Sequence, residues 1–196
     1  GMGPRNAQLL LQHNWLPNGF SDPTIDLQGI GYGPPGSEYL IDAAADSPYL
    51  DSTFQLWTED FGVTGGTERF SFTAVNGTAD SELYQRYRRG DSFEYDLDLP
   101  NGSYDVTLHL AEVQWSAAGQ RIMDVSAEGV VMLDDYDIFL EAGGAFLAHT
   151  ETFGVTVSDG TLDLDFVGVV DTTIVSAIEV RARFAVLDVT PTSHAL

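Results

Sequence analysis

The sequence predicts an all-β fold, an antiparallel β-sandwich, from two observations. Apolar and polar residues alternate over many short stretches, and turn residues separate these stretches at close intervals. A strand with one face in the core and the other in water shows this period of two. Because no stretch has a convincing helical period, we expect about eight to eleven short strands in two packed sheets.

The clearest strands lie between residues 92 and 110. Residues 93–99 and 104–110 alternate apolar and polar side chains, and Asn101-Gly102 lies between them. Asn-Gly tolerates the positive φ angles that a two-residue hairpin turn requires, so we expect an antiparallel hairpin here. By the same reasoning Glu128-Gly129 and Asp159-Gly160 each predict another hairpin. The side chains expected to face the interior are those of Tyr104, Val106, Leu108 and Leu110.

Differences in Pro and Gly content and in hydrophobic periodicity divide the chain into three predicted parts. Residues 1–38 are rich in Pro and Gly turns and poor in periodicity, which predicts an extension or linker, anchored on the main domain by Trp15, Phe20 and Tyr32. Residues 39–184 form the main domain, with Trp57 in its core. Residues 185–196 contain a Pro-Thr-Ser stretch that indicates a linker, so we expect further domains in a longer parent chain.

Charge is the strongest feature of the composition. The chain has 30 acidic and 8 basic residues, every basic residue is Arg, and the net charge is −22. Such a surface repels itself unless salt shortens the Debye length to about 3 Å at 1 M, so we interpret it as adaptation to high salt. An ordinary acidic extracellular domain, with or without calcium, is the alternative. Neither nucleic acid nor an anionic membrane fits a surface without a basic patch.

Metal and cofactor sites lack support in the sequence. There is no cysteine, and the four histidines are scattered without zinc-ligand spacing. The acidic residues at 134–137 and Glu141 lack the regular spacing of a calcium loop, so we expect solvated loop carboxylates. No stretch approaches the roughly 20 apolar residues of a membrane span. If the natural protein is exported, we expect its signal to have been removed.

Four stretches, taken together and in order, resemble a malectin domain, a carbohydrate-binding module. They are LYQRY at 83–87, YDVTLHLAEVQWSAAGQRIMDVSAEG, LDDYDIFLEAGG, and DGTLDLDFVGVVDTTIVSAIEV, and the match is dense over residues 82–183. The resemblance implies a jelly roll of the galactose-binding-like kind. It also implies sugar binding without turnover, no cofactor, and a place outside the cell or at its surface.

The same resemblance implies which residues bind the sugar, namely aromatic residues on several loops and one late Asp. The late Asp matches Asp171, and an aromatic pair matches Gln114 and Trp115, where Gln114 offers no stacking face. The Tyr of the family's Arg-Tyr element matches Tyr87, although its spacing to the next strand is shorter here. By rough spacing Phe70 matches an early aromatic; core positions are the alternative for Phe70 and Tyr87.

Three functions follow, in order of support. The first is a non-catalytic module for a glucose- or galactose-type oligosaccharide or polysaccharide. The second is a structural or adhesive spacer that kept the fold and lost the site, which Gln114 leaves open. The third is a glycoside hydrolase-like enzyme, for which Glu112 and Asp171 beside the expected ligand loops are the nominated acid pair, without a supporting motif.

We expect the melting temperature to climb steadily with sodium or potassium chloride. Added salt screens the repulsion among the 30 carboxylates, because the Debye length falls from about 10 Å at 0.1 M to under 3 Å at about 2 M. Thermal unfolding at several salt concentrations in this range measures the effect. An unchanged melting temperature would contradict the salt-adaptation hypothesis.

Overall fold

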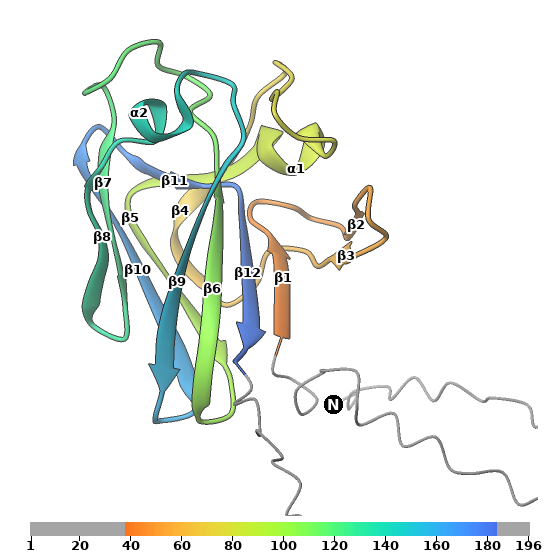
Figure 1. The fold of residues 1–196 in the computed structure, drawn as a ribbon, viewed down its shortest axis with the longest axis vertical. Helices are drawn as coiled ribbons and strands as arrows, with labels where there is room; N and C mark the ends of the chain where they lie inside the picture. Colours follow the sequence, from red (N-terminus) through yellow and green to blue (C-terminus); the bar gives the residue numbers. More distant parts are fainter. Residues whose placement is uncertain (1–37, 184–196) are drawn as a thin grey trace, which may run out of the picture. The chain divides into compact units, whose positions relative to one another are not determined.

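The structure describes residues 38–183 of a computed structural model, which fold into two large β-sheets and one small two-stranded sheet (Figure 1). One sheet has the strand order β1-β12-β6-β9; the other has the order β11-β5-β10-β7-β8, with β4 paired to β5. All pairings between these strands are antiparallel. The predicted all-β antiparallel sandwich is confirmed.

The elements are β1 (Glu38–Asp42), β2 (Tyr49–Leu50), β3 (Leu56–Trp57), β4 (Val63–Phe70), α1 (Ser81–Gln85), β5 (Arg86–Asp98), β6 (Gly102–Leu110), β7 (Ile122–Ala127), β8 (Val130–Tyr136), α2 (Ile138–Ala142), β9 (His149–Val157), β10 (Thr161–Val170), β11 (Thr173–Val175) and β12 (Ala177–Ala182). The strands β2 and β3 pair only with each other. Predictions for residues 1–37 and 185–196 lie outside the described residues.

The core lies between the facing sheets and is filled by the alternate residues that the pattern predicts. Tyr104, Val106, Leu108 and Leu110 of β6 are all buried, which confirms their expected direction. From the opposite sheet, Phe93 stacks on Phe166 with ring centroids 4.8 Å apart. Trp57 is also buried as predicted, and its Nε1 donates a hydrogen bond to Asp51 Oδ2 at 3.0 Å.

Two of the three predicted hairpins are wrong. The chain crosses from one sheet to the other at Asn101-Gly102 and again at Asp159-Gly160, so the strands on either side face each other across the core instead of pairing. Only Glu128-Gly129 closes a paired hairpin, between β7 and β8. There both residues have positive φ (51° and 69°), as a two-residue hairpin turn demands, whereas Asn101 and Gly102 do not. Alternation marks the inward face of a strand but does not identify its partner.

The two five-residue helices correct the prediction that the chain has no helix. Each is too short to show a helical period in the sequence. The second, α2, begins after Asp137, whose Oδ1 accepts a hydrogen bond from Leu140 N, and ends at Gly143 with φ 79°. Asp137 is therefore a buried helix cap instead of the predicted solvated loop carboxylate. Neither helix is long and apolar enough to cross a membrane, within the residues described.

Asp60 links the loop after β1 to β5, because its carboxylate forms a buried ion pair with Arg88 and accepts a hydrogen bond from Ala44. Its Oδ2 accepts hydrogen bonds from Arg88 Nε at 2.9 Å, Arg88 Nη2 at 2.6 Å and the backbone N–H of Ala44 at 2.8 Å. The Tyr95 hydroxyl donates to Oδ1 at 2.9 Å. Because a buried carboxylate is stable only when it is paired and hydrogen-bonded, this set of donors fixes the edge of the sandwich beside β1.

Asp42 lies close to the same ion pair but lacks the counter-charge and the set of hydrogen bonds that stabilise Asp60. It is 1% exposed, and its Oδ1 has no hydrogen-bond partner among the described residues. Burial raises the pKa of Asp42 to about 7, although the charge of Arg86 opposes the shift. The folded protein therefore holds a proton on Asp42 that the unfolded chain releases near pH 4.

We expect the free energy of unfolding to fall between about pH 4 and pH 7, and Asp42→Asn to remove part of that fall. Because the pKa of Asp42 is higher in the folded state, Asp42 stabilises the fold fully below its unfolded pKa. This stabilisation is lost as the pH rises through the folded pKa of about 7. The difference of about three pH units between the two pKa values corresponds to at most about 4 kcal/mol. Denaturant titrations at pH 5 and pH 8 measure the difference. Asp46→Asn, at a side chain 85% exposed, is the control; equal pH dependence in all three proteins would contradict the assignment.

Candidate functional site

Two loops meet at the upper end of the sandwich in Figure 1, the β6–β7 loop and the β10–β11 loop. The half-buried Trp115 of the first loop donates its indole N–H to Asp171 Oδ2 of the second at 2.7 Å. Gln114, beside Trp115, is exposed and accepts a hydrogen bond from Arg89 of β5 at 3.0 Å. The structure thus brings Gln114, Trp115 and Asp171 together.

The β10–β11 loop is tight because of Gly168. A Cβ at this position would lie 2.3 Å from the backbone oxygen of Asp171 and 3.0 Å from Thr173 N, so no other residue fits without moving the loop. Asp171 itself has φ 58°, a conformation that Asp tolerates better than most side chains. The loop thereby turns the Asp171 carboxylate toward the β6–β7 loop.

A buried ion pair holds both loops in place. Glu112 and Arg121 are 0% and 2% exposed, and Arg121 Nε donates to Glu112 Oε2 at 2.7 Å. Glu112 Oε1 accepts the backbone N–H groups of Gln114 (2.8 Å) and Trp115 (2.9 Å). Arg121 Nη1 donates to the backbone oxygen of Thr172 and, at 2.9 Å, to its hydroxyl. One ion therefore positions Trp115, and the other positions the residue after Asp171.

Arg89 is a second cation of the site. Its Nε donates to Thr172 Oγ1 at 2.6 Å, and its Nη2 lies 3.4 Å from Asp171 Oδ1. Arg121 Nη1 lies 3.7 Å from the other oxygen of Asp171. Although partial burial opposes ionisation, the hydrogen bond from Trp115 and the charges of Arg121 and Arg89 lower the pKa of Asp171. Asp171 is therefore an ionised carboxylate held between Trp115 and two arginines.

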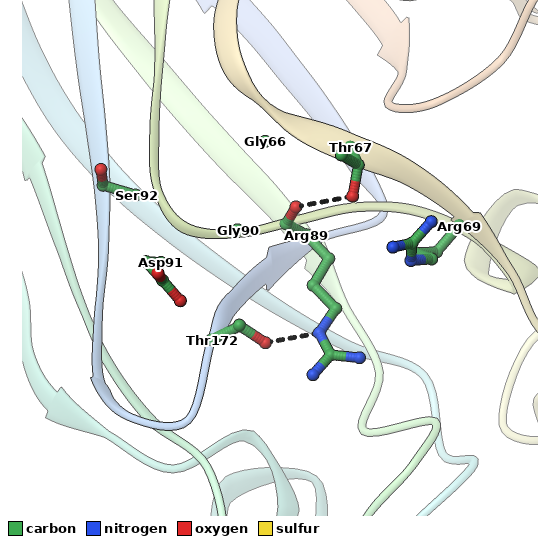
Figure 2. A pocket seen from close by; sticks show the side chains of 8 residues that line it. All are labelled: Gly66, Thr67, Arg69, Arg89, Gly90, Asp91, Ser92 and Thr172. Atoms are coloured by element: carbon green, nitrogen blue, oxygen red, sulfur yellow. Dashed lines mark hydrogen bonds between the residues drawn. The ribbon is translucent and has the colours of Figure 1, made fainter.

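A hollow of about 560 Å³ adjoins this cluster (Figure 2). It forms where β5 bends at Gly90 and exchanges its neighbour β10 for β11, opposite an irregularity in the pairing of β4. Arg89 and Thr172 belong both to the cluster and to the wall of the hollow. The lining residues are Gly66, Thr67, Arg69, Arg89, Gly90, Asp91, Ser92 and Thr172.

The other two candidate residues lie differently. Tyr87 is 8% exposed and packs in the core cluster. Phe70, at the end of β4, is 45% exposed and meets Phe72 edge to face with ring centroids 5.0 Å apart. Their roles in binding stay predictions.

Sequence reasoning missed Arg89 and Thr172 and did not recognise that Glu112 and Arg121 position the loops. No local pattern singled out Arg89, because its partners Gln114 and Asp171 lie 25 and 82 residues away in the chain. No group of three or more His, Cys, Asp or Glu side chains in residues 38–183 is arranged to hold a metal.

The sequence profile of the malectin domain matches residues 38–184. The chain belongs to the malectin domain family. Relatives of this malectin domain include Malectin-B of Xenopus laevis, 33% identical over 87 residues, which are 43% of this chain and 31% of that protein. A probable LRR receptor-like serine/threonine-protein kinase of Arabidopsis thaliana is 31% identical over 133 residues, 59% of this chain and 13% of the kinase. The chain spans less than a third of either relative.

Solved structures with the same fold include a β-glucuronidase of Bacteroides uniformis and the plant receptor-like kinase FER. The first has a TM-score of 0.67 at 21% identity, covering 75% of this chain and 18% of the enzyme. The second has a TM-score of 0.65 at 19% identity, covering 74% of this chain and 42% of that chain. At such identities the likeness establishes the fold of the malectin domain alone.

We expect Glu112→Gln to destabilise the malectin domain by about 3–5 kcal/mol, because it leaves the Arg121 guanidinium buried without its main counter-charge. Denaturant unfolding measures the loss. Glu38→Gln is the matched control, since Glu38 lies 3.8 Å from Arg181 in a pair whose side chains are 30% and 41% exposed, where water screens the charges. Losses of equal size in the two variants would show that the Glu112–Arg121 pair does not hold the loops.

Proposed function

We propose that this malectin domain is a non-catalytic carbohydrate-binding module for a glucose- or galactose-type oligosaccharide. The observation that carries the proposal is the pairing of Trp115 with Asp171 beside a polar hollow. Sugar binding needs a flat apolar surface for the C–H face of a pyranose and fixed polar groups for its hydroxyls. The indole of Trp115 is the surface, and the carboxylate of Asp171 accepts hydroxyl hydrogen bonds.

Arg89 and Gln114 complete the polar part of this site. The amide of Gln114 replaces a second aromatic ring, and its oxygen is held by Arg89. Its NH₂ group remains a donor for a sugar oxygen. The site therefore relies on one stacking surface and several hydrogen bonds, which fits a weak affinity in the millimolar to micromolar range, about −4 to −8 kcal/mol.

The nominated acid pair does not suit glycoside hydrolysis. Such enzymes need a carboxylic acid with a raised pKa next to the scissile bond. The pKa of Asp171 is lowered, and Glu112 is 0% exposed with both oxygens occupied by Arg121 and backbone amides. These two carboxylates hold structure and bind ligand in our proposal, without breaking bonds.

We further propose that the domain acts outside the cell or at its surface as one part of a longer chain. Support comes from the small fraction of each relative that the match covers and from the plant receptor ectodomains that share its fold. An oligosaccharide or polysaccharide is then the partner, presented by another molecule or surface.

We expect Trp115→Ala and Asp171→Asn each to weaken sugar binding several-fold or abolish it. A stacked aromatic contributes about 0.5–1.5 kcal/mol beyond area, and a hydrogen bond to a charged group about 1.5–3 kcal/mol. Calorimetry with the strongest oligosaccharide from a glycan array, run in molar sodium chloride, measures the change. Phe54→Ala is the control, because this aromatic side chain between β2 and β3 is 85% exposed and outside the cluster.

Two results would contradict the proposal. Unchanged affinity in both variants would place the site elsewhere. Failure of the unmodified protein to bind any glycan of the array would favour the spacer alternative instead.

A further inference from the structure

Two guanidinium groups line the hollow beside Trp115, although basic residues are scarce in this chain. The net charge is −22 with only 8 basic residues, yet Arg69 and Arg89 both line this hollow, together with one carboxylate, Asp91. The charge of Arg89 is offset by Asp171, whose Oδ1 lies 3.4 Å from Arg89 Nη2. Arg69 is therefore the cation of this hollow that can attract an anionic group.

Arg69 differs from the other arginines that the structure describes. Each of the others has a carboxylate within 4 Å, whereas no such contact is present for Arg69 among residues 38–183. Its single hydrogen bond runs from Nη1 to the backbone oxygen of Glu68 at 3.3 Å. Within residues 38–183, four of the five N–H donors of this guanidinium therefore have no partner and can serve a ligand.

Arg89 has the complementary role. Three of its five N–H donors are used by Thr172, Gln114 and Asp171, so the guanidinium is held in place from three sides and has fewer donors left for a ligand than Arg69. In Figure 2 the Arg69 guanidinium points toward the Arg89 side chain, with Thr172 and Asp91 on the other sides of the hollow. A free cation and a fixed cation thus face the same space.

The hollow is lined in part by glycines, which have no side chains to fill it. A Cβ at Gly90 would lie 3.0 Å from Gly66 Cα and 3.0 Å from Ser92 O, so both strands approach closely without side chains between them. The resulting volume of about 560 Å³ lies within the usual range for small-ligand sites, about 300–1,000 Å³. One or two sugar rings fit such a volume.

We propose that the hollow binds an anionic sugar residue, whose carboxylate or sulfate pairs with Arg69 while the adjoining sugar stacks on Trp115. The proposal rests on the proposed function and narrows its ligand to acidic glycans. The planar fork of Arg69 matches two oxygens of a carboxylate or sulfate. Asp91 and the hydroxyls of Ser92 and Thr67 accept or donate hydrogen bonds to the ring hydroxyls. A neutral sugar would offer Arg69 only uncharged hydroxyl oxygens, which form weaker hydrogen bonds than a carboxylate or sulfate.

The test uses the full chain in calorimetry with matched oligosaccharides. The probes are oligogalacturonates and oligoglucuronates, their methyl esters, the neutral galactose and glucose oligosaccharides of the same linkage, and sulfated galactose oligosaccharides. We expect the acidic forms to bind about tenfold or more tightly than their esters, since a hydrogen bond to a charged group contributes about this factor. Preference for the carboxylated or the sulfated probe identifies the anion.

Variants separate this inference from the proposed function. Arg69→Gln should abolish the preference for acidic probes and leave the affinity for neutral ones unchanged, and Arg69→Lys should retain part of the preference. Arg181→Gln, in the opposite sheet, is the control and should behave as the unmodified protein. Trp115→Ala should weaken acidic and neutral probes alike.

Each remaining outcome counts against one of the two proposals. Equal binding of acidic and neutral probes by the unmodified protein overturns the acidic-glycan inference and leaves the proposed function intact. A preference that persists in Arg69→Gln also overturns it, because the anion is then recognised elsewhere. Binding of no probe overturns the proposed function, and the inference fails with it.

Discussion

The ion pair between Glu112 and Arg121 is the interaction on which the functional end of this sandwich depends. Neither loop has a core of its own, and each is held by one member of the pair: backbone amides of Gln114 and Trp115 by Glu112, and Thr172 by Arg121. A buried charge is costly unless it is paired and its hydrogen-bonding capacity is used. The two loops supply the hydrogen bonds of Glu112 and of Arg121 Nη1, while Arg121 Nη2 has no partner among residues 38–183. Correct placement of the loops and burial of the pair therefore depend on each other.

Three arginines, Arg88, Arg89 and Arg121, are placed where a planar, multiply bonded cation is needed. Arg88 closes the edge beside β1 through Asp60, Arg121 joins the two loops, and Arg89 links Gln114 to Asp171. Each donates from at least two nitrogens of its planar guanidinium, whereas the ammonium of Lys has a single nitrogen and no fixed plane. The absence of Lys from the sequence thus fits two demands, an acidic surface and rigid internal cation sites.

The sequence correctly predicted features that depend on local patterns, such as which face of a strand is buried. It did not predict features that depend on residues far apart in the chain, such as which strands pair. Alternation placed Tyr104 and Leu108 in the core, because burial of one strand face is a local property. Asn101-Gly102 was misread because a corner between sheets and a hairpin turn use the same residues, and only the strand partners distinguish them. Trp115 and Asp171 were brought together by resemblance to a family. Arg89 was missed because its partners lie 25 and 82 residues away in the chain.

In the sugar site that we propose, Gln114 stands where the family resemblance implies an aromatic ring, and this difference would alter which ligands the site selects. A stacking surface contributes about 0.5–1.5 kcal/mol beyond area and accepts most pyranoses, whereas a hydrogen bond to a charged group contributes about 1.5–3 kcal/mol and depends on the position of each hydroxyl or anion. With Trp115 as the stacking surface and Arg89 fixing the amide of Gln114, more of the recognition falls on directional contacts. A ligand that mismatches them leaves polar groups unpaired, so this arrangement favours discrimination between sugars over tight binding of any one of them.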